Sequence, residues 1–206
     1  ETHLYWLQTQ KPFLIAVDAA VNILLSKGIT PDIVVSIDRK SRHLFTNRDL
    51  HSLSAVPLVY FPEVDSLLLQ DWHGPRFYSY SDTKRYKNMP KHLSKVTLYS
   101  AGSVIHPTID LAVKLHASAI YLLGADFSFT LGKSHATPSS TVKLQQSIEN
   151  APHWLLNSLN QKVPTLANLK GYLRDLERYI SKHQHIKFYN CSKLGARIAG
   201  TTLWKK

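Results

Sequence analysis

The sequence contains very little sulfur: its 206 residues include one cysteine, Cys191, and one methionine. One cysteine cannot form an internal disulfide or supply a thiolate metal cluster, and this usage is typical of a reducing compartment. No apolar run approaches the ~18 residues of a membrane span. The first residues also lack the apolar core of a signal peptide. We therefore expect a cytoplasmic protein without a membrane span.

Several catalytic signatures are missing as well. The 11 histidines include no H-x-x-x-H or H-E-x-x-H pair, which argues against a zinc peptidase. No G-x-S-x-G sequence marks a serine nucleophile. The G-x-x-x-x-G-K-[ST] sequence of phosphate-binding P-loops is absent too. These absences leave chemistry that depends on carboxylates, hydroxyls and backbone N–H groups.

Positive charge is abundant but scattered. The chain has 25 Lys and Arg against 14 acids, a net charge of +11, which favours anionic partners. Basic residues cluster only at 84–87 and 91–92, and no arginine-rich tract or nucleic-acid fingerprint is present. We expect a solvated basic surface and a small anionic ligand, and we do not expect nucleic acid as the partner.

Apolar runs and helical patterns alternate along the chain. Strands are predicted at 12–17, 33–37, 58–61, 96–99, 119–123 and 185–190, and helices at 20–27, 105–113 and 165–180, the last with Thr165 as its N-cap. Runs that are apolar throughout are typical of buried parallel strands. The pattern predicts an α/β fold, a doubly wound and mostly parallel sheet with helices on both faces.

The sequence predicts one domain over residues 1–206. Residues 131–164, rich in Gly, Pro and Ser, are predicted to form a lid-like loop with short helices. The chain enters its first strand almost at once, so we expect that a further N-terminal strand belongs to the domain but lies outside this sequence.

Three aspartates, Asp18, Asp38 and Asp126, each end a predicted strand. In parallel sheets ligands bind at the carboxyl ends of the strands. Carboxylates there could hold a divalent cation such as Mg²⁺ or bind sugar hydroxyls. Alternatively, each could cap its own turn. Asp126 is the leading candidate, also as a metal ligand, because Gly124 leaves room for a ligand to approach the backbone.

The small-residue turn at 100–103 is a second candidate site. Ser100 and Ser103 offer hydroxyls, and Gly102 lets the backbone turn tightly just before a predicted helix N-terminus, where anions bind. The same turn could serve packing alone. His135 follows Asp126 on the predicted lid, and we assign it a possible acid/base or phosphate-contacting role.

Four motifs in order resemble a known family: ITPDIVVSID at 29–38, SAGSV at 100–104, YLLGADF at 121–127, and YN at 189–190 with GARIAGT at 195–201. They resemble the central domain of the motility accessory factor (Maf) flagellin glycosyltransferases, which is shared with archaeal 6-hydroxymethylpterin diphosphokinases. The resemblance covers about 12–204. It implies a Rossmann-like domain related to bacterial sialyltransferases, whose donor is a CMP-activated sugar.

The resemblance also implies site residues. The Gly-Ala-Asp-Phe run containing Asp126 is similar to the strand-end G-x-D-F of the sialyltransferases, and Asp18 matches their nucleotide-contacting strand end. Two features of the relatives are missing: a Gly-Pro-Ser turn expected before residue 1, and a catalytic-base His, where this chain has Leu-Asn-Gln-Lys at 159–162. We therefore assign Asp126 and His135 as catalytic residues and the following as donor-binding residues: Asp18, Asp38, Ser100, Gly102, Ser103, Gly124 and Asn190.

Three functions follow from these expectations. The leading hypothesis is transfer of a nonulosonic, sialic-acid-like sugar from a nucleotide, which the resemblance implies is CMP, to Ser or Thr hydroxyls of a protein such as flagellin. The first alternative is Mg²⁺-dependent diphosphate transfer from ATP to a 6-hydroxymethyl-dihydropterin, since phosphoryl transfer depends on positioning and charge neutralisation. The second is a non-catalytic module that binds an acidic partner.

Overall fold

The computed structural model describes residues 2–87, 96–129 and 153–204. The chain divides into two compact units, Glu1–Lys114 and Leu115–Lys206. Each unit carries its own parallel sheet, which confirms the α/β class. A single domain over 1–206 stays a prediction. Within the described ranges, no helix combines the length and the apolar character that a membrane crossing requires.

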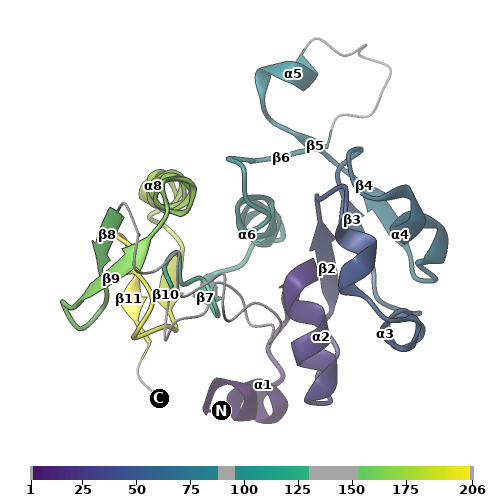
Figure 1. Cartoon of the computed structure of the whole chain (residues 1–206), viewed down its shortest axis with the longest axis horizontal. Helices are drawn as coiled ribbons and strands as arrows, with labels where there is room; N and C mark the ends of the chain where they lie inside the picture. The colour runs from purple at the N-terminus through teal and green to yellow at the C-terminus, as the bar shows by residue number, and fades with distance from the viewer. Residues whose placement is uncertain (1, 88–95, 130–152, 205–206) are drawn as a thin grey trace. The chain divides into compact units, whose positions relative to one another are not determined.

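Unit 1 is built on a four-stranded parallel sheet of order β1-β2-β3-β4 (Figure 1). Its strands are β1 (Ile15–Val17), β2 (Ile33–Ser36), β3 (Leu58–Tyr60) and β4 (Arg76–Tyr78), and a two-stranded pair joins β5 (Tyr80–Ser81) to β6 (Thr97–Leu98). The helices are α1 (Thr2–Gln10), α2 (Asp18–Ser26), η1 (Ser41–Leu44), α3 (Asn47–Ser52), α4 (Ser66–Asp71), α5 (Lys84–Lys87) and α6 (Ile105–Lys114).

Both faces of the unit 1 sheet are buried at its central strands β2 and β3, whereas the edge strand β4 is exposed. Val35 and Val59 are register partners, and they belong to an apolar cluster completed by Val104 at the start of α6. The next register pair, Val34 with Leu58, points to the opposite face because side chains alternate along a strand. Val34 and Leu58 have no exposed surface. This explains the unbroken apolar runs of the sequence.

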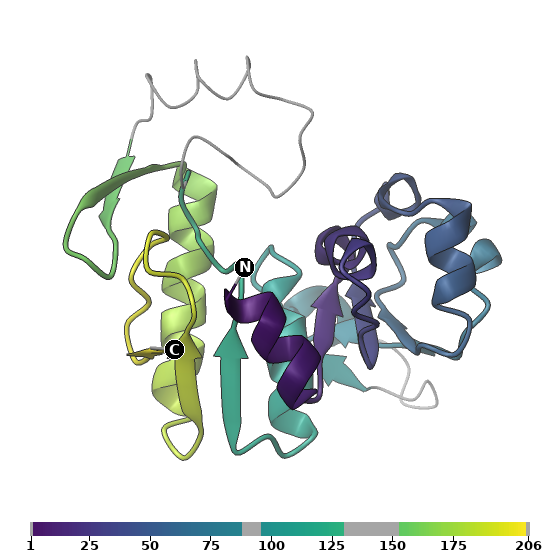
Figure 2. The ribbon, with the colours of Figure 1, turned by 90° about the horizontal axis from the view of Figure 1, so that it is seen from below.

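Unit 2 has a three-stranded parallel sheet of order β11-β10-β7. Its elements are β7 (Ala119–Leu122), β8 (His153–Leu156), β9 (Lys162–Thr165), α8 (Ala167–Lys182), β10 (Lys187–Asn190) and β11 (Thr202–Leu203). The long helix α8 lies along one face of the sheet (Figure 2). It turns an apolar stripe inward, in which Leu173, Leu176 and Ile180 are buried. Tyr121 and Tyr189 stack on neighbouring strands, with ring centroids 4.7 Å apart.

Two sequence predictions in this region are wrong. Part of the predicted lid at 131–164 is instead an antiparallel hairpin, since β8 pairs with β9 in register from His153↔Thr165 to Leu156↔Lys162. Thr165 does not cap a helix: it ends β9, and its hydroxyl donates to the carbonyl of Phe127 at 2.7 Å. Gly and Pro residues suggested a loop, but alternating side chains and a turn at Asn160, which has φ 59°, favour a hairpin.

Candidate functional site

Asp126 lies just beyond the carboxyl end of β7, after Gly124, which has φ 72°. Its backbone is held firmly. The Asp126 carbonyl accepts hydrogen bonds from the Ala196 N–H at 2.7 Å and from the Ser128 hydroxyl at 3.1 Å. The next residue, Phe127, has φ 49°, a left-handed conformation that is costly for a residue with a side chain. Fixed backbone contacts on both sides therefore compensate for local strain at this strand end.

The Asp126 carboxylate is positioned but has no charge partner among the residues that the structure describes. The side chain is half-buried, and no hydrogen bond or ion pair to its oxygens is found among the described residues. Gly195 packs against it so closely that a Cβ at Gly195 would lie 2.5 Å from Asp126 Oδ1 and 2.7 Å from Asp126 Cα. A half-exposed carboxylate with free lone pairs is suited to accept hydrogen bonds from ligand hydroxyls.

Asn190 organises the loop that carries Gly195. It ends β10 and is 2% exposed. Its Oδ1 accepts from the Ser192 N–H at 2.9 Å, and its Nδ2 donates to the Ala196 carbonyl at 3.3 Å. The Gly195 N–H in turn donates to the Ser192 hydroxyl at 3.0 Å. The amide thus shapes the backbone beside Asp126, and direct contact of Asn190 with a donor stays a prediction.

In unit 1, Asp18 begins α2 at the carboxyl end of β1 and is 2% exposed. Its Oδ2 accepts from the Ser36 hydroxyl at 2.7 Å, and its Oδ1 accepts from the Ala19 N–H at 2.8 Å. Burial raises the pKa of Asp18 above its ordinary value of 3.8, although these two hydrogen bonds oppose the change. The negative charge of Asp38 raises this pKa further.

Asp38 is exposed and lies two residues beyond β2. Because β1 and β2 are parallel and Val17 pairs with Val35, Asp18 and Asp38 both follow strand ends at the same edge of the sheet. The carbonyl of Asp38 accepts from the N–H groups of Ser41 and Asp65, each at 3.3 Å. The backbone of Asp38 is therefore fixed by the two segments that follow β2 and β3. Its side chain is exposed, and no hydrogen bond or ion pair to its carboxylate is found within the described part of the chain.

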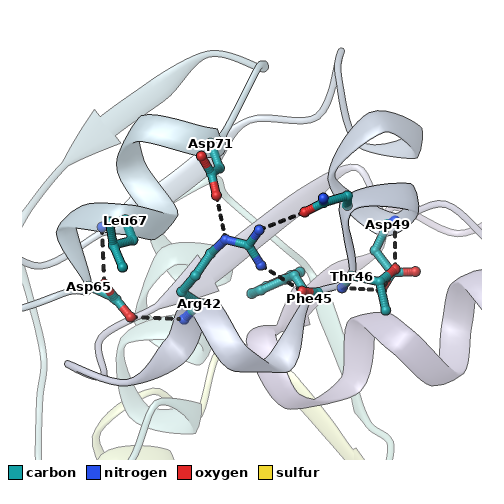
Figure 3. A network of polar contacts seen from close by, with 8 residues as sticks. Arg42, Phe45, Thr46, Asp49, Asp65, Leu67 and Asp71 are labelled. Atoms are coloured by element: carbon teal, nitrogen blue, oxygen red, sulfur yellow. Dashed lines mark hydrogen bonds and ion pairs between the residues drawn. The ribbon is translucent and has the colours of Figure 1, made fainter.

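The loop after β2 is held by Arg42 (Figure 3). Its Nε donates to Asp71 Oδ2 at 2.5 Å, and its two terminal nitrogens donate to the Phe45 carbonyl at 2.7 Å and to Asn47 Oδ1 at 2.8 Å. The Arg42 N–H also contacts Asp65 Oδ2 at 3.3 Å. One guanidinium thus connects η1, the start of α3 and the end of α4, which the sequence analysis did not anticipate.

The turn at 100–103 precedes α6 as predicted. Gly102 has φ 88°, and the Ser100 N–H donates to Asp82 Oδ1 at 3.0 Å. The Ser103 carbonyl lies 3.1 Å from Nδ1 of His106, which is buried. Asp82 was missed by the sequence analysis, since it follows no long apolar run. One backbone N–H of the turn is therefore already occupied, and anion binding there stays a prediction.

The structure thus brings the candidates together in two groups. Asp18 and Asp38 share one edge in unit 1, whereas Asp126 and Asn190 share one edge in unit 2. His135 lies outside the described residues, so its role stays a prediction. Across the ranges described, no three His, Cys, Asp or Glu side chains gather in a way that could hold a metal ion. The metal role assigned to Asp126 also stays a prediction.

Parallel sheets with helices and with polar side chains at the carboxyl ends of their strands define an α/β protein of the Rossmann-like class. The chain belongs to the 6-hydroxymethylpterin diphosphokinase MptE-like family, whose model matches residues 1–132. The family resemblance seen in the sequence is thereby confirmed.

Two similar proteins extend this result. An uncharacterized protein from Treponema pallidum (strain Nichols) is 24% identical over 183 residues, covering 76% of this chain and 40% of that protein. The chain therefore spans about two fifths of this relative. The structure of a MAf glycosyltransferase from Magnetospirillum magneticum AMB-1 matches with a TM-score of 0.72 and 17% identity, over 98% of this chain and 31% of the other. At this identity the likeness shows a shared fold.

Proposed function

We propose that this chain is the nucleotide-sugar-binding part of a glycosyltransferase. The observation that carries the proposal is the Asp126 carboxylate, held by its backbone at a strand end and without a partner among the residues described. The shared fold with a MAf glycosyltransferase supports it. We further propose a nonulosonic sugar on CMP as the donor, Ser or Thr hydroxyls of a protein such as flagellin as the acceptor, and the cytoplasm as the location.

Charge determines which part of the donor Asp126 would meet. A carboxylate repels phosphate oxygens, so it is suited to hydroxyl groups of the sugar or ribose, which donate hydrogen bonds to it. Holding these hydroxyls would place the anomeric carbon for attack. The acceptor oxygen forms the new bond to this carbon while the bond to the nucleotide phosphate breaks. His135 is our candidate to remove the acceptor proton.

The leaving phosphate gains negative charge, and catalysis needs positive groups arranged for that charge. Within unit 1 taken by itself, Arg39 and Lys40 directly follow Asp38 and are exposed, so we propose them as binding groups for an anion at that sheet edge. The turn that contains Ser100, Gly102 and Ser103 offers backbone N–H groups for the same purpose. Asp18 is fully engaged by Ser36 and Ala19, so we propose that it shapes this edge instead of contacting the donor.

The test combines ligand binding with one substitution. Thermal denaturation with CMP, CDP, UDP, ATP and a pterin should show stabilisation by CMP first. Asp126→Asn keeps the shape and removes the charge, so we expect the stability to change by no more than about 0.5 kcal/mol. Donor turnover should fall at least about tenfold, which corresponds to about 1.4 kcal/mol. An Asp126→Asn protein that is clearly less stable than the parent but binds nucleotide with the same affinity would show that Asp126 is only structural.

Diphosphate transfer is the second candidate, favoured by the description of the matching family model. It would transfer a diphosphate group from ATP to the hydroxyl of a 6-hydroxymethyl-dihydropterin and release AMP, with Mg²⁺ neutralising the phosphates. Release of AMP that requires both Mg²⁺ and the pterin would favour this activity. Release of CMP from a CMP-sugar in the presence of an acceptor, without AMP formation, would favour glycosyl transfer.

A further inference from the structure

Unit 2 contains an open pocket between the β8–β9 hairpin, α8 and the loop after β10, with a volume of about 540 Å³. Four cationic side chains line it: Lys162 comes from the hairpin, Lys170 and Arg174 come from α8, and Arg197 comes from the loop. We call it the hairpin pocket. Figure 2 shows the hairpin beside the N-terminal end of α8. Asp126 is not part of the lining.

The positive charge of the hairpin pocket is not neutralised by the described residues. Lys170 and Arg174 lie one turn apart on α8, a spacing at which like charges repel. No ion pair or hydrogen bond from either side chain is found within the described ranges. Glu177 is the acidic residue of the lining, and its Oε1 already accepts from the Ala199 N–H at 2.8 Å. Four cations and one acid leave the lining with a charge of +3.

One wall of the hairpin pocket is apolar and exposed. Trp154 and Leu156 lie two residues apart on β8, so their side chains project from the same face of the hairpin. They are 54% and 43% exposed. Exposed apolar groups next to converging charges are typical of binding sites. An indole ring also attracts the flat face of a planar group by stacking.

We propose that the hairpin pocket binds a phosphate or diphosphate ester that is joined to an apolar or planar group. The guanidinium groups of Arg174 and Arg197 match phosphate oxygens in shape and charge. The volume falls within the range of small-molecule sites, about 300–1,000 Å³. The cations surround one concavity, as a compact anion requires, whereas an extended acidic chain would need a stripe. This site goes beyond the proposed function, because it does not include Asp126.

The test uses phenyl phosphate as the probe and titration calorimetry as the measurement, with the whole chain. The double variant Lys170→Gln/Arg174→Gln should bind phenyl phosphate at least about tenfold more weakly, because two charge-assisted hydrogen bonds are lost. The matched control is Arg178→Gln/Lys182→Gln, which removes the same charge from the same helix outside the pocket lining. The control should bind as the parent does. Trp154→Ala should lower the affinity for phenyl phosphate and leave the affinity for inorganic phosphate unchanged.

Further titrations with other phosphate compounds identify the source of the phosphate group. CMP represents nucleotides, and phosphatidylcholine vesicles with and without phosphatidic acid represent lipid headgroups. Equal losses in the two double variants would overturn the proposal, because only general charge would then matter. Binding of a polyglutamate peptide without binding of any phosphate ester would overturn it too. Asp126→Asn should leave phenyl phosphate binding intact, so failure of the glycosyltransferase proposal and failure of this one give different results.

Discussion

Substituting Gly195 by alanine tests the contact between the loop after β10 and Asp126. The new Cβ would lie 2.5 Å from Asp126 Oδ1, 2.7 Å from Asp126 Cα and 2.8 Å from the Ser192 hydroxyl oxygen. The carboxylate and hydroxyl could rotate away, but Asp126 Cα cannot, because the Asp126 carbonyl is hydrogen-bonded to the Ala196 N–H. The loop itself must therefore move.

The size of the effect can be bounded. Overpacking of a close contact costs about 1–3 kcal/mol. Alanine also lowers the conformational entropy of the unfolded chain, which stabilises the folded state by about 0.4–1 kcal/mol where the backbone conformation suits alanine. Gly195 is not among the glycines with positive φ, so the loss is steric. We expect the free energy of unfolding to fall by about 1–2 kcal/mol, which lowers Tm by about 4–8 °C for each kcal/mol in a unit of this size.

Gly171 provides a matched control in the same unit. It lies inside α8, has no positive φ, and a Cβ there would meet nothing within 4 Å. Gly171→Ala should therefore stabilise the protein by about 0.5–1 kcal/mol, since alanine favours helix. Chemical denaturation followed by far-ultraviolet circular dichroism measures both variants. In addition, Gly195→Ala should weaken CMP-sugar binding, whereas Gly171→Ala should not.

Two results would refute this reasoning. If Gly195→Ala is as stable as the parent, the loop accommodates a methyl group and does not pack closely on Asp126. If both variants lose stability equally, the effect is a general response to added volume. A destabilised Gly195→Ala protein that still binds the donor with full affinity would separate the packing of the loop from the function of Asp126.

Three further changes test other parts of the structure. Because burial raises the pKa of Asp18, the folded state holds this proton to higher pH than the unfolded chain, so stability is lost as pH rises from 3.8 through the raised pKa. Asp18→Asn can still accept from the Ala19 N–H with its amide oxygen, while its NH2 group would donate to the Ser36 hydroxyl, which now donates to Asp18. This variant should gain stability over the parent with increasing pH, and parallel pH curves in urea denaturation would contradict the expectation. Arg42→Lys cannot reproduce the three side-chain contacts of the guanidinium, so the free energy of unfolding should fall by about 1–2 kcal/mol, more than for Arg178→Lys. Burial raises the pKa of Cys191 to about 11 from its ordinary value of 9.0. Because only the thiolate reacts, iodoacetamide at pH 8 should alkylate the folded protein at least about a hundredfold more slowly than the unfolded chain. Comparable alkylation rates, measured by mass spectrometry, would show that Cys191 is accessible.

The sequence predicts the strands β1, β2, β3 and β7 well because their residues are almost all apolar. Val34 and Val35 are both buried, one on each face of the sheet, and no amphipathic pattern competes with this assignment. The β8–β9 hairpin was missed because Pro164 and Gln161 read as loop residues, although Pro164 lies at the sheet edge, where a missing N–H costs little. The composition indicated a loop, while pairing between residues 6 to 12 positions apart formed a hairpin.

The candidate site was predictable only in part. Strand-end aspartates can be read from the order of residues, and Asp18, Asp38 and Asp126 do follow β1, β2 and β7. Their different environments cannot be read this way, because Ser36 reaches Asp18 across the sheet from 18 residues away. The hairpin pocket is also invisible in the sequence, since Lys162, Lys170 and Arg197 meet only after the hairpin folds onto α8.

Successive backbone N–H groups of the loop after β10 face in opposite directions. The Ala196 N–H donates to the Asp126 carbonyl at 2.7 Å, and the Arg197 N–H donates to the Leu156 carbonyl on β8 at 2.9 Å. These two peptide groups therefore connect the backbone of Asp126 to strand β8, which lines the hairpin pocket. If a ligand in the hairpin pocket shifts β8 and thereby changes donor affinity at Asp126, reciprocity requires that the donor change the affinity of the pocket ligand by the same factor. Hydrogen exchange at the Ala196 and Arg197 amides would record either event.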